Sequence, residues 1–227
     1  NLQFEFGLRK TTNQKFDNQN THRFGITYKN KNKKIFFNHS TAFKNPTFTE
    51  RYGYYAGTFK GNSNLKPESV RQYEIGYSIN TTEEKINISQ TFYNAKLKNE
   101  INGLANHPEG GYTAKNMASN SYRKGLETKL KYNINKYSNA SISYNYVDST
   151  EYNSTSEKQK SELRRPKNIL NFNYDNSFFN NLSISSNIFY SSKIKDTDFS
   201  SYPYQNVYMN SYFLFNTTMN YNVDSKN

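Results

Sequence analysis

Apolar and polar residues alternate with a period of two along most of this chain. Between residues 72 and 79, for example, Tyr and Ile occupy the odd positions, whereas Gln, Glu, Gly and Ser occupy the even positions. Successive side chains of a β-strand point to opposite faces, so this pattern predicts strands with one apolar and one polar face. No window has a comparable helical period, and we therefore expect an all-β protein. The alternation recurs in ten segments, which are residues 4–8, 24–28, 35–42, 73–79, 86–92, 126–134, 142–146, 170–174, 182–190 and 213–223.

The connections between these predicted strands alternate between long and short. An antiparallel up-and-down transmembrane β-barrel has this arrangement, because its turns are tight at one membrane surface and its loops are long at the other. A soluble β-sandwich gives no reason for it. We therefore predict a partial transmembrane barrel of about ten strands. The long connections cover about residues 10–21, 43–69, 98–121, 148–166 and 192–210, and the short ones about 30–34, 80–85, 135–140 and 176–181.

Charged residues in the middle of predicted strands share the polar parity, as Glu74, Glu127, Lys129 and Lys131 do. A Lys that faced lipid near the bilayer midplane would cost roughly 2–4 kcal/mol, so this confinement indicates a hydrated lumen. Tyrosines near predicted strand ends suit the aromatic belts of the two membrane interfaces, although aromatic residues also favour strands in general. These tyrosines are Tyr28, Tyr132, Tyr146, Tyr174, Tyr190 and Tyr221.

Composition leaves other classes of protein to consider. Only 33% of residues are hydrophobic, which is low enough for a disordered chain, but aromatic residues make up 17% and recur at regular positions, which favours a folded one. The net charge of +12 would suit a nucleic-acid partner. The lysines, however, cluster at turns such as residues 29–34, so we expect no nucleic acid. A soluble β-domain that binds RNA remains a rival, and its binding would weaken steeply with salt.

The ends of the chain suggest that it is part of a larger barrel. The first and last predicted strands would each leave backbone groups unpaired, and lipid cannot satisfy them. No signal peptide and no apolar run of about 18 residues is present, so we also expect an upstream N-terminus.

Three stretches, residues 42–52, 61–69 and 73–76, resemble a hallmark of TonB-dependent receptors. The resemblance implies a barrel of about 22 strands around a plug domain, located in outer-membrane lipid of a Gram-negative bacterium and energised by the TonB–ExbB–ExbD system. Residues 1–227 would then be one partial barrel domain, with the plug and first strands before Asn1 and the last strands after Asn227. The motif residues, which we expect to shape the loop and its strand, are Pro46, Glu50, Asn64, Leu65, Pro67, Glu68, Glu74 and Gly76.

Residues 164–167 and 196–209 are similar to cobalamin-transporting members of that family. The resemblance implies an importer of cobalamin, with a ferric siderophore as the alternative cargo. A barrel without a transport role of this kind, such as a porin, an adhesin or an autotransporter translocator, remains a rival from another class. The calcium-binding loops of cobalamin transporters would lie outside this chain, so no metal ligand carries over.

No catalytic constellation is present in the sequence. His22, His39 and His107 lack metal-ligand spacing, and no Ser, His and Asp set has a local signature. The absence of Cys excludes a thiol nucleophile. We therefore expect neither an enzyme nor a resident cofactor or metal.

Long-loop residues are the candidates for contact with a cargo. Loop aromatic residues offer a large contact area at low entropy cost, which suits a rigid ligand, although they also anchor loops at the interface. The aromatic candidates are Tyr52, Tyr54, Tyr55, Phe59, Tyr112, Tyr202 and Tyr204. Cationic residues would attract an anionic siderophore or remain as solvated loop charge. The cationic candidates are Arg51, His107, Arg164 and Arg165.

Overall fold

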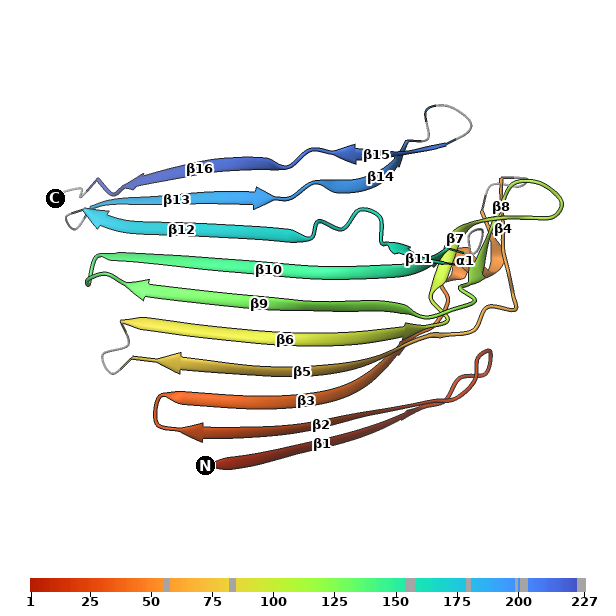
Figure 1. The fold of residues 1–227 in the computed structure, drawn as a ribbon, viewed down its shortest axis with the longest axis horizontal. Helices are drawn as coiled ribbons and strands as arrows, with labels where there is room; N and C mark the ends of the chain where they lie inside the picture. The colour runs from red at the N-terminus through yellow and green to blue at the C-terminus, as the bar shows by residue number, and fades with distance from the viewer. Residues whose placement is uncertain are drawn as a thin grey trace.

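The computed structural model describes residues 1–54, 58–81, 85–153, 158–178, 181–198, 200 and 204–223. Ten long antiparallel strands form one curved sheet in the order β1-β2-β3-β5-β6-β9-β10-β12-β13-β16, and the short β11 pairs with β10 (Figure 1). Every neighbour along this path is also the next long strand in sequence, which is the up-and-down topology expected from the alternation. The strands are β1 (Leu2–Thr11), β2 (Gln19–Asn30), β3 (Lys33–Lys44), β5 (Glu68–Asn80), β6 (Ile86–Lys98), β9 (Ser121–Asn133), β10 (Ser138–Asn153), β11 (Lys158–Ser161), β12 (Asn168–Phe178), β13 (Leu182–Ser191) and β16 (Tyr212–Tyr221).

Each predicted strand segment overlaps one of the ten long strands, although residue 134 and residues 222–223 lie just beyond the ends of β9 and β16. Several strands also run further toward the long loops. β10 continues to Asn153, so Tyr146 lies in the middle of a strand and not near its end as expected. The extension is polar, and its backbone still pairs with β9, as in Asp148 opposite Lys124. Hydrophobic and polar residues alternate only in the part of a strand that crosses an apolar layer. The predicted strand is therefore shorter than the observed one.

The strand register brings the apolar side chains together on one face. One row of register partners crosses seven strands and contains Ile79, Ile88, Leu130, Ile142, Phe172, Ile188 and Phe215. None of the described residues covers this face, where Ile75 is 54% exposed and Tyr73 is 45% exposed. In the described part of the chain, only Leu65, Ala95 and Ala114 are buried hydrophobic residues. A sheet without a packed core and with an exposed apolar face is what lipid solvation requires.

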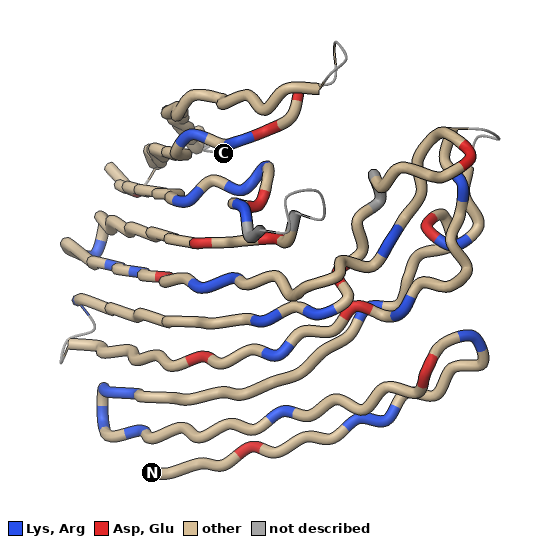
Figure 2. The backbone as a smooth tube through the Cα atoms, turned by 45° about the vertical axis from the view of Figure 1, so that its right-hand side comes forward, with Lys and Arg blue, Asp and Glu red and all other residues tan. Residues whose placement is uncertain are grey.

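The sheet is curved (Figure 2), and the face opposite the apolar one carries the polar side chains. A hollow of about 460 Å³ on this face is lined by residues from β1 through β9, including Glu5, Glu74 and Glu127. Farther along the sheet, Asn187 donates a hydrogen bond to Asn173 (2.8 Å), which in turn donates to Ser141 (3.4 Å). The predicted lumen-facing parity is thus the concave face.

A polar pair also occurs on the apolar face. Gln90 donates a hydrogen bond to the Thr128 hydroxyl (3.1 Å) and accepts one from the Tyr77 hydroxyl (3.1 Å). These cross-strand bonds satisfy groups that lipid would leave without partners.

Short turns lie at one end of the sheet and long connections at the other (Figure 1). The turn between β2 and β3 is closed by Lys31 and Asn32, with Lys31 in the left-handed region at φ 50°. The long connections contain further structure that the sequence pattern did not predict, namely α1 (Phe48–Tyr52), a small sheet of β4 (Phe59–Lys60), β7 (Ile101–Asn106) and β8 (Tyr112–Asn116), and a hairpin of β14 (Ile194–Asp198) and β15 (Gln205–Met209). Among the described residues, no helix is long and apolar enough to cross a membrane.

Candidate ligand-capture site at the loop end

The helix α1 opens the connection between β3 and β5. Thr47 is its N-cap and accepts a hydrogen bond from the Glu50 backbone N–H (3.2 Å), while the Glu50 carboxylate accepts one from the Thr47 N–H (2.7 Å). This reciprocal arrangement satisfies two N–H groups that a helix start otherwise leaves free. Arg51 donates to the Ser63 carbonyl (3.1 Å), and its guanidinium lies 4.7 Å from the centre of the Phe16 ring. Glu50 and Arg51 therefore hold the loops in place.

Two asparagines fasten the segment after β4 to β8. Asn62 donates to the Ala114 carbonyl (2.9 Å), and Asn116 both accepts from the Lys66 N–H (2.8 Å) and donates to the Lys66 carbonyl (2.9 Å). A Cβ on Gly61 would lie 2.4 Å from the Arg51 carbonyl oxygen, so the close approach of the two segments requires glycine here. Sequence reasoning did not identify Asn62 or Asn116, because their partners lie about fifty residues away.

The other motif residues lie in the connection between β3 and β5 and on β5 itself. Glu68 accepts a hydrogen bond from the Ile101 N–H (2.7 Å) and forms an ion pair with the Lys44 ammonium (2.9 Å). Its side chain therefore connects β5 to both β3 and β7. Glu74 faces the lumen and accepts from Gln72 (2.6 Å). Gly76 leaves room for the Phe36 ring, since an added Cβ would lie 2.5 Å from it. Of the others, Pro46, Leu65 and Pro67 are buried and Asn64 is exposed.

Four of the aromatic candidates form a continuous set, which we call the loop aromatic cluster: Tyr54, Phe59, Tyr112 and Tyr204. The Tyr54 and Phe59 rings stack with centroids 5.4 Å apart, and Phe59 is the register partner of Tyr112. The Tyr112 and Tyr204 hydroxyls are 2.9 Å apart. Three separate connections thus contribute to one aromatic surface. Tyr52 is outside it and contacts Phe48 (4.6 Å between ring centroids), and Tyr55 and Tyr202 lie outside the described residues.

The other three cationic candidates, like Arg51, have partners within the protein. Arg164 pairs with Asp196 (2.7 Å) and Arg165 with Glu162 (2.9 Å). His107 belongs to a tight turn, where its Nδ1 accepts from the Glu109 N–H (3.2 Å). The two ion pairs reduce the positive charge that Arg164 and Arg165 can offer to an anionic ligand.

Arg123 centres an ion-pair cluster that sequence reasoning did not identify. Its guanidinium makes two bonds to Glu162 (2.8 and 3.0 Å) and one to Glu100 (2.9 Å). Burial acts to raise the pKa of Glu162, but the hydrogen bonds and charges of Arg123 and Arg165 outweigh it, so this pKa lies below its usual value. The cluster fixes the connection between β10 and β12 to the strand β9.

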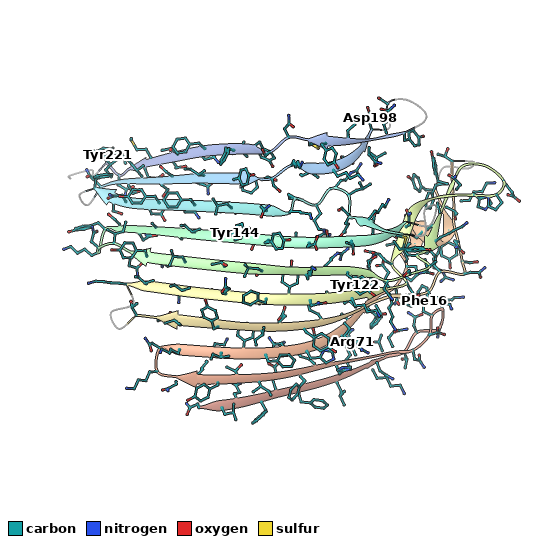
Figure 3. The ribbon with its side chains drawn as sticks, in the orientation of Figure 1. Phe16, Arg71, Tyr122, Tyr144, Asp198 and Tyr221 are labelled. Carbon is teal, nitrogen blue, oxygen red and sulfur yellow. The ribbon has the colours of Figure 1, made fainter. Side chains whose placement is uncertain are left out.

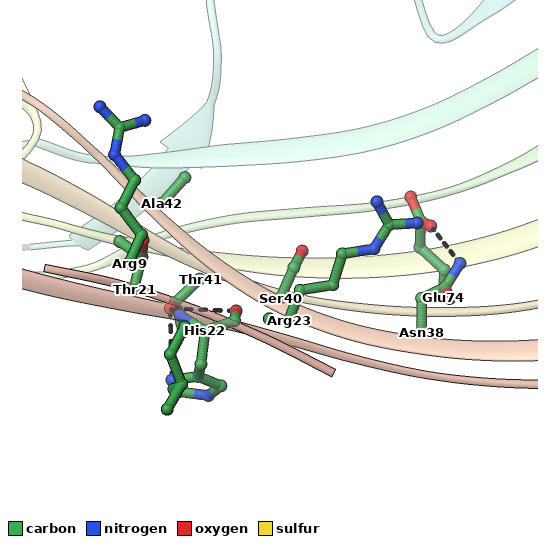
Figure 4. A pocket seen from close by; sticks show the side chains of 11 residues that line it. Arg9, Thr21, His22, Arg23, Asn38, Ser40, Thr41, Ala42 and Glu74 are labelled. Atoms are coloured by element: carbon green, nitrogen blue, oxygen red, sulfur yellow. Dashed lines mark hydrogen bonds between the residues drawn. The ribbon is translucent and has the colours of Figure 1, made fainter. Parts of the chain in front are cut away.

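Below the loops, the lumenal face of β1 to β5 forms a hollow of about 570 Å³ (Figure 4). Arg9 and Arg23 extend into it, and Asn38 donates to the Glu74 carboxylate (3.4 Å). Arg23 also pairs with Glu5 (3.4 Å), and both side chains are more than half exposed. This surface is polar and presents charges of both signs to the lumen. In the part of the chain that the structure describes, no three His, Cys, Asp or Glu residues are placed to hold a metal.

A curved up-and-down sheet with a polar concave face, an exposed apolar face and elaborate loops at one end defines part of an outer-membrane β-barrel. The family model for the β-barrel of TonB-dependent receptor-like proteins matches residues 1–227. The chain belongs to this family, whose members are transporters in the outer membrane of Gram-negative bacteria and not enzymes.

The chain is also similar to individual members of known name. It is 27% identical over 180 residues to the vitamin B12 transporter BtuB of Photobacterium profundum, a match that covers 75% of this chain and 27% of the relative. A mutant of the ferric enterobactin receptor PfeA of Pseudomonas aeruginosa, in complex with enterobactin, has a TM-score of 0.78 at 17% identity, covering 99% of this chain and 36% of that one. For the siderophore receptor PirA of Acinetobacter baumannii, the TM-score is 0.79 at 15% identity, with coverages of 99% and 38%. The chain thus spans about a quarter to two fifths of these relatives' lengths.

Proposed function

We propose that the full-length protein is an energy-coupled importer of cobalamin, captured by the loops and passed through the lumen. The observation that carries this proposal is the similarity to a vitamin B12 transporter over three quarters of the chain. It agrees with the resemblance of residues 196–209 to cobalamin transporters. Energy would come from the TonB–ExbB–ExbD system, acting on a plug domain upstream of these strands.

The loop aromatic cluster supports a large, rigid and partly apolar cargo. Tyr and Phe side chains provide wide contact surfaces with few rotatable bonds, and tyrosine hydroxyls add hydrogen bonds at the edge. Contact with the cargo is therefore proposed for Tyr54, Phe59, Tyr112 and Tyr204. The ion pairs of Arg164 and Arg165 support cobalamin over an anionic cargo, since both arginines would have to leave carboxylate partners.

A ferric siderophore of the catecholate type is the alternative cargo. The likeness to PfeA and PirA supports a shared fold only, because the identities are 17% and 15%. Arg9 and Arg23, which extend into the lumenal hollow, are among the cations that would suit an anionic solute, although Arg23 also pairs with Glu5. The family match argues against the rival class of function, which is an outer-membrane barrel without TonB-dependent import, such as a porin, an adhesin or an autotransporter translocator.

Equilibrium binding to the purified full-length receptor separates these cargoes. We expect cyanocobalamin to bind in the nanomolar range and ferric enterobactin not to compete. Tyr112→Ala and Phe59→Ala should weaken cobalamin binding tenfold or more, whereas Tyr137→Ala, at a short turn on the opposite end, should not change it. Absence of cyanocobalamin binding, together with binding of ferric enterobactin, would replace cobalamin by the siderophore. Uptake that persists in cells without TonB would contradict energy coupling.

A further inference from the structure

Two histidines that are distant in sequence converge on the outer face of the sheet. His22 of β2 and His39 of β3 place their Nε2 atoms 3.1 Å apart, with ring centroids separated by 5.1 Å. They are diagonal neighbours, since His39 is the register partner of Phe24, and such neighbours are within reach of long side chains. In Figure 4, the ring of His22 points away from the face that carries Arg9 and Arg23.

We propose that His22 and His39 form a binding site for a divalent transition-metal ion of the Cu²⁺ or Zn²⁺ type. Each imidazole nitrogen lies about 2.0–2.1 Å from such an ion, so two ligands at a tetrahedral angle are about 3.3 Å apart. The observed separation of 3.1 Å is close to this value before any ring moves.

Neighbouring groups orient both rings for this role. The Nδ1 of His39 is 3.1 Å from the Gln72 carbonyl oxygen, which can only accept, so Nδ1 carries the proton and Nε2 offers a lone pair. Ligating histidines characteristically donate their other N–H to a carbonyl in this way. In the metal-free pair, His22 Nε2 donates to His39 Nε2. On metal binding, that proton moves to His22 Nδ1, where the Thr41 hydroxyl, 3.5 Å away, can accept it.

The location gives the ion access to water. On the loop side of His39, one row of register partners contains Thr41, Arg71 and Lys96 (Arg71 is labelled in Figure 3). On the other side, the row of Phe37, Ile75 and Phe92 is apolar. The pair therefore lies at the boundary between the lipid and the loop-side water. On the His22 side of the pair, a hollow of about 310 Å³ lined by His22, Thr41, Arg71 and Lys96 leaves room for water ligands. The positive charges of Arg71 and Lys96 repel a cation that is held by electrostatic attraction alone. The site should therefore select transition-metal ions, which bond strongly to imidazole nitrogen.

The Tyr73 ring stacks on His39 (4.5 Å between centroids) and limits its rotation. A bound ion would bridge β2 and β3 through their side chains. It would therefore stabilise the folded barrel by mass action.

Titration of the purified full-length receptor with Cu²⁺, followed by electron paramagnetic resonance, tests the site. We expect hyperfine coupling to two imidazole nitrogens in the unmodified protein, with at least a tenfold loss of affinity for this Cu²⁺ in His22→Gln and in His39→Gln. His107→Gln, which changes the third histidine of the chain, should bind Cu²⁺ like the unmodified protein. Zn²⁺ should raise the unfolding midpoint of the unmodified protein and of His107→Gln only.

Three results would overturn the proposal. They are an unmodified protein without nitrogen coupling, equal Cu²⁺ binding by the His22→Gln and unmodified proteins, and an equal loss in His107→Gln. The first uses no variant and therefore holds even if a substituted barrel does not fold.

Discussion

The hydroxyl groups of Tyr112 and Tyr204 lie 2.9 Å apart, although the two residues are separated by 92 positions. This contact connects β8 with the hairpin of β14 and β15, so it couples two loops of the proposed capture site. A neutral hydrogen bond of this kind contributes about 0.5–1.5 kcal/mol.

Removal of either hydroxyl should therefore loosen both loops. We expect Tyr112→Phe and Tyr204→Phe each to speed limited proteolysis of the loops about two- to tenfold, and the double variant to be no faster than the faster single variant, because one interaction is lost in all three. Tyr137→Phe at a short turn is the control and should have no effect. Strictly additive effects would show that the two hydroxyls are not coupled.

The ion pairs of Glu162 should contribute measurably to stability, since its side chain is only 15% exposed. Glu162→Gln removes the ion pair of Arg165 and one of the two carboxylate partners of Arg123, which keeps Glu100, and we expect it to lower the free energy of unfolding by about 1–2 kcal/mol. Glu5→Gln is a matched control, because the Glu5 side chain is 54% exposed and its pair with Arg23 should contribute less than about 1 kcal/mol. Denaturant unfolding in detergent measures both. Equal effects would contradict the larger contribution expected from the partly buried cluster.

The same cluster predicts a pH dependence. The pKa of Glu162 is lower in the folded protein than its usual value of 4.5. The stabilisation is therefore fully present above pH 4.5 and is lost as the pH falls through the folded pKa. The difference in unfolding midpoint between the unmodified protein and Glu162→Gln should be constant from about pH 7 to pH 5 and shrink below that range. A difference that grows on acidification would contradict the assigned sign.

Gly125 should be irreplaceable in β9. An added Cβ would lie 2.3 Å from the Tyr146 carbonyl oxygen and 2.5 Å from the Tyr93 hydroxyl, and the first of these atoms is backbone of the neighbouring strand. We expect Gly125→Ala to destabilise the barrel by about 1–3 kcal/mol. Gly7→Ala is the control, because the nearest atom to its Cβ is 4.0 Å away, and its effect should stay within about 0.5 kcal/mol. Equal unfolding midpoints for the two variants would refute this prediction.

The sequence was sufficient to predict the long strands, because lipid and lumen impose opposite polarity on alternate residues such as Glu74 and Ile75. It did not predict β4, β7 and β8, which lie outside the apolar layer and therefore carry no such alternation. The pairing of Arg123 with Glu162 depends on a contact across 39 positions, and no local pattern encodes it. His22 and His39 likewise come together only through the register of β2 and β3.

The central claim is that the apolar parity faces lipid and the polar parity faces a hydrated lumen. Residues 1–227 contain no cysteine, so single cysteines at positions 74 and 75 can each carry a nitroxide label in a receptor reconstituted in bilayers, once any cysteine elsewhere in the full-length protein has been replaced. A label at Ile75 should collide mainly with oxygen, which concentrates in lipid, and a label at Glu74 mainly with a water-soluble nickel complex. The reverse preference, or equal access of the nickel complex to both positions, would contradict the transmembrane assignment.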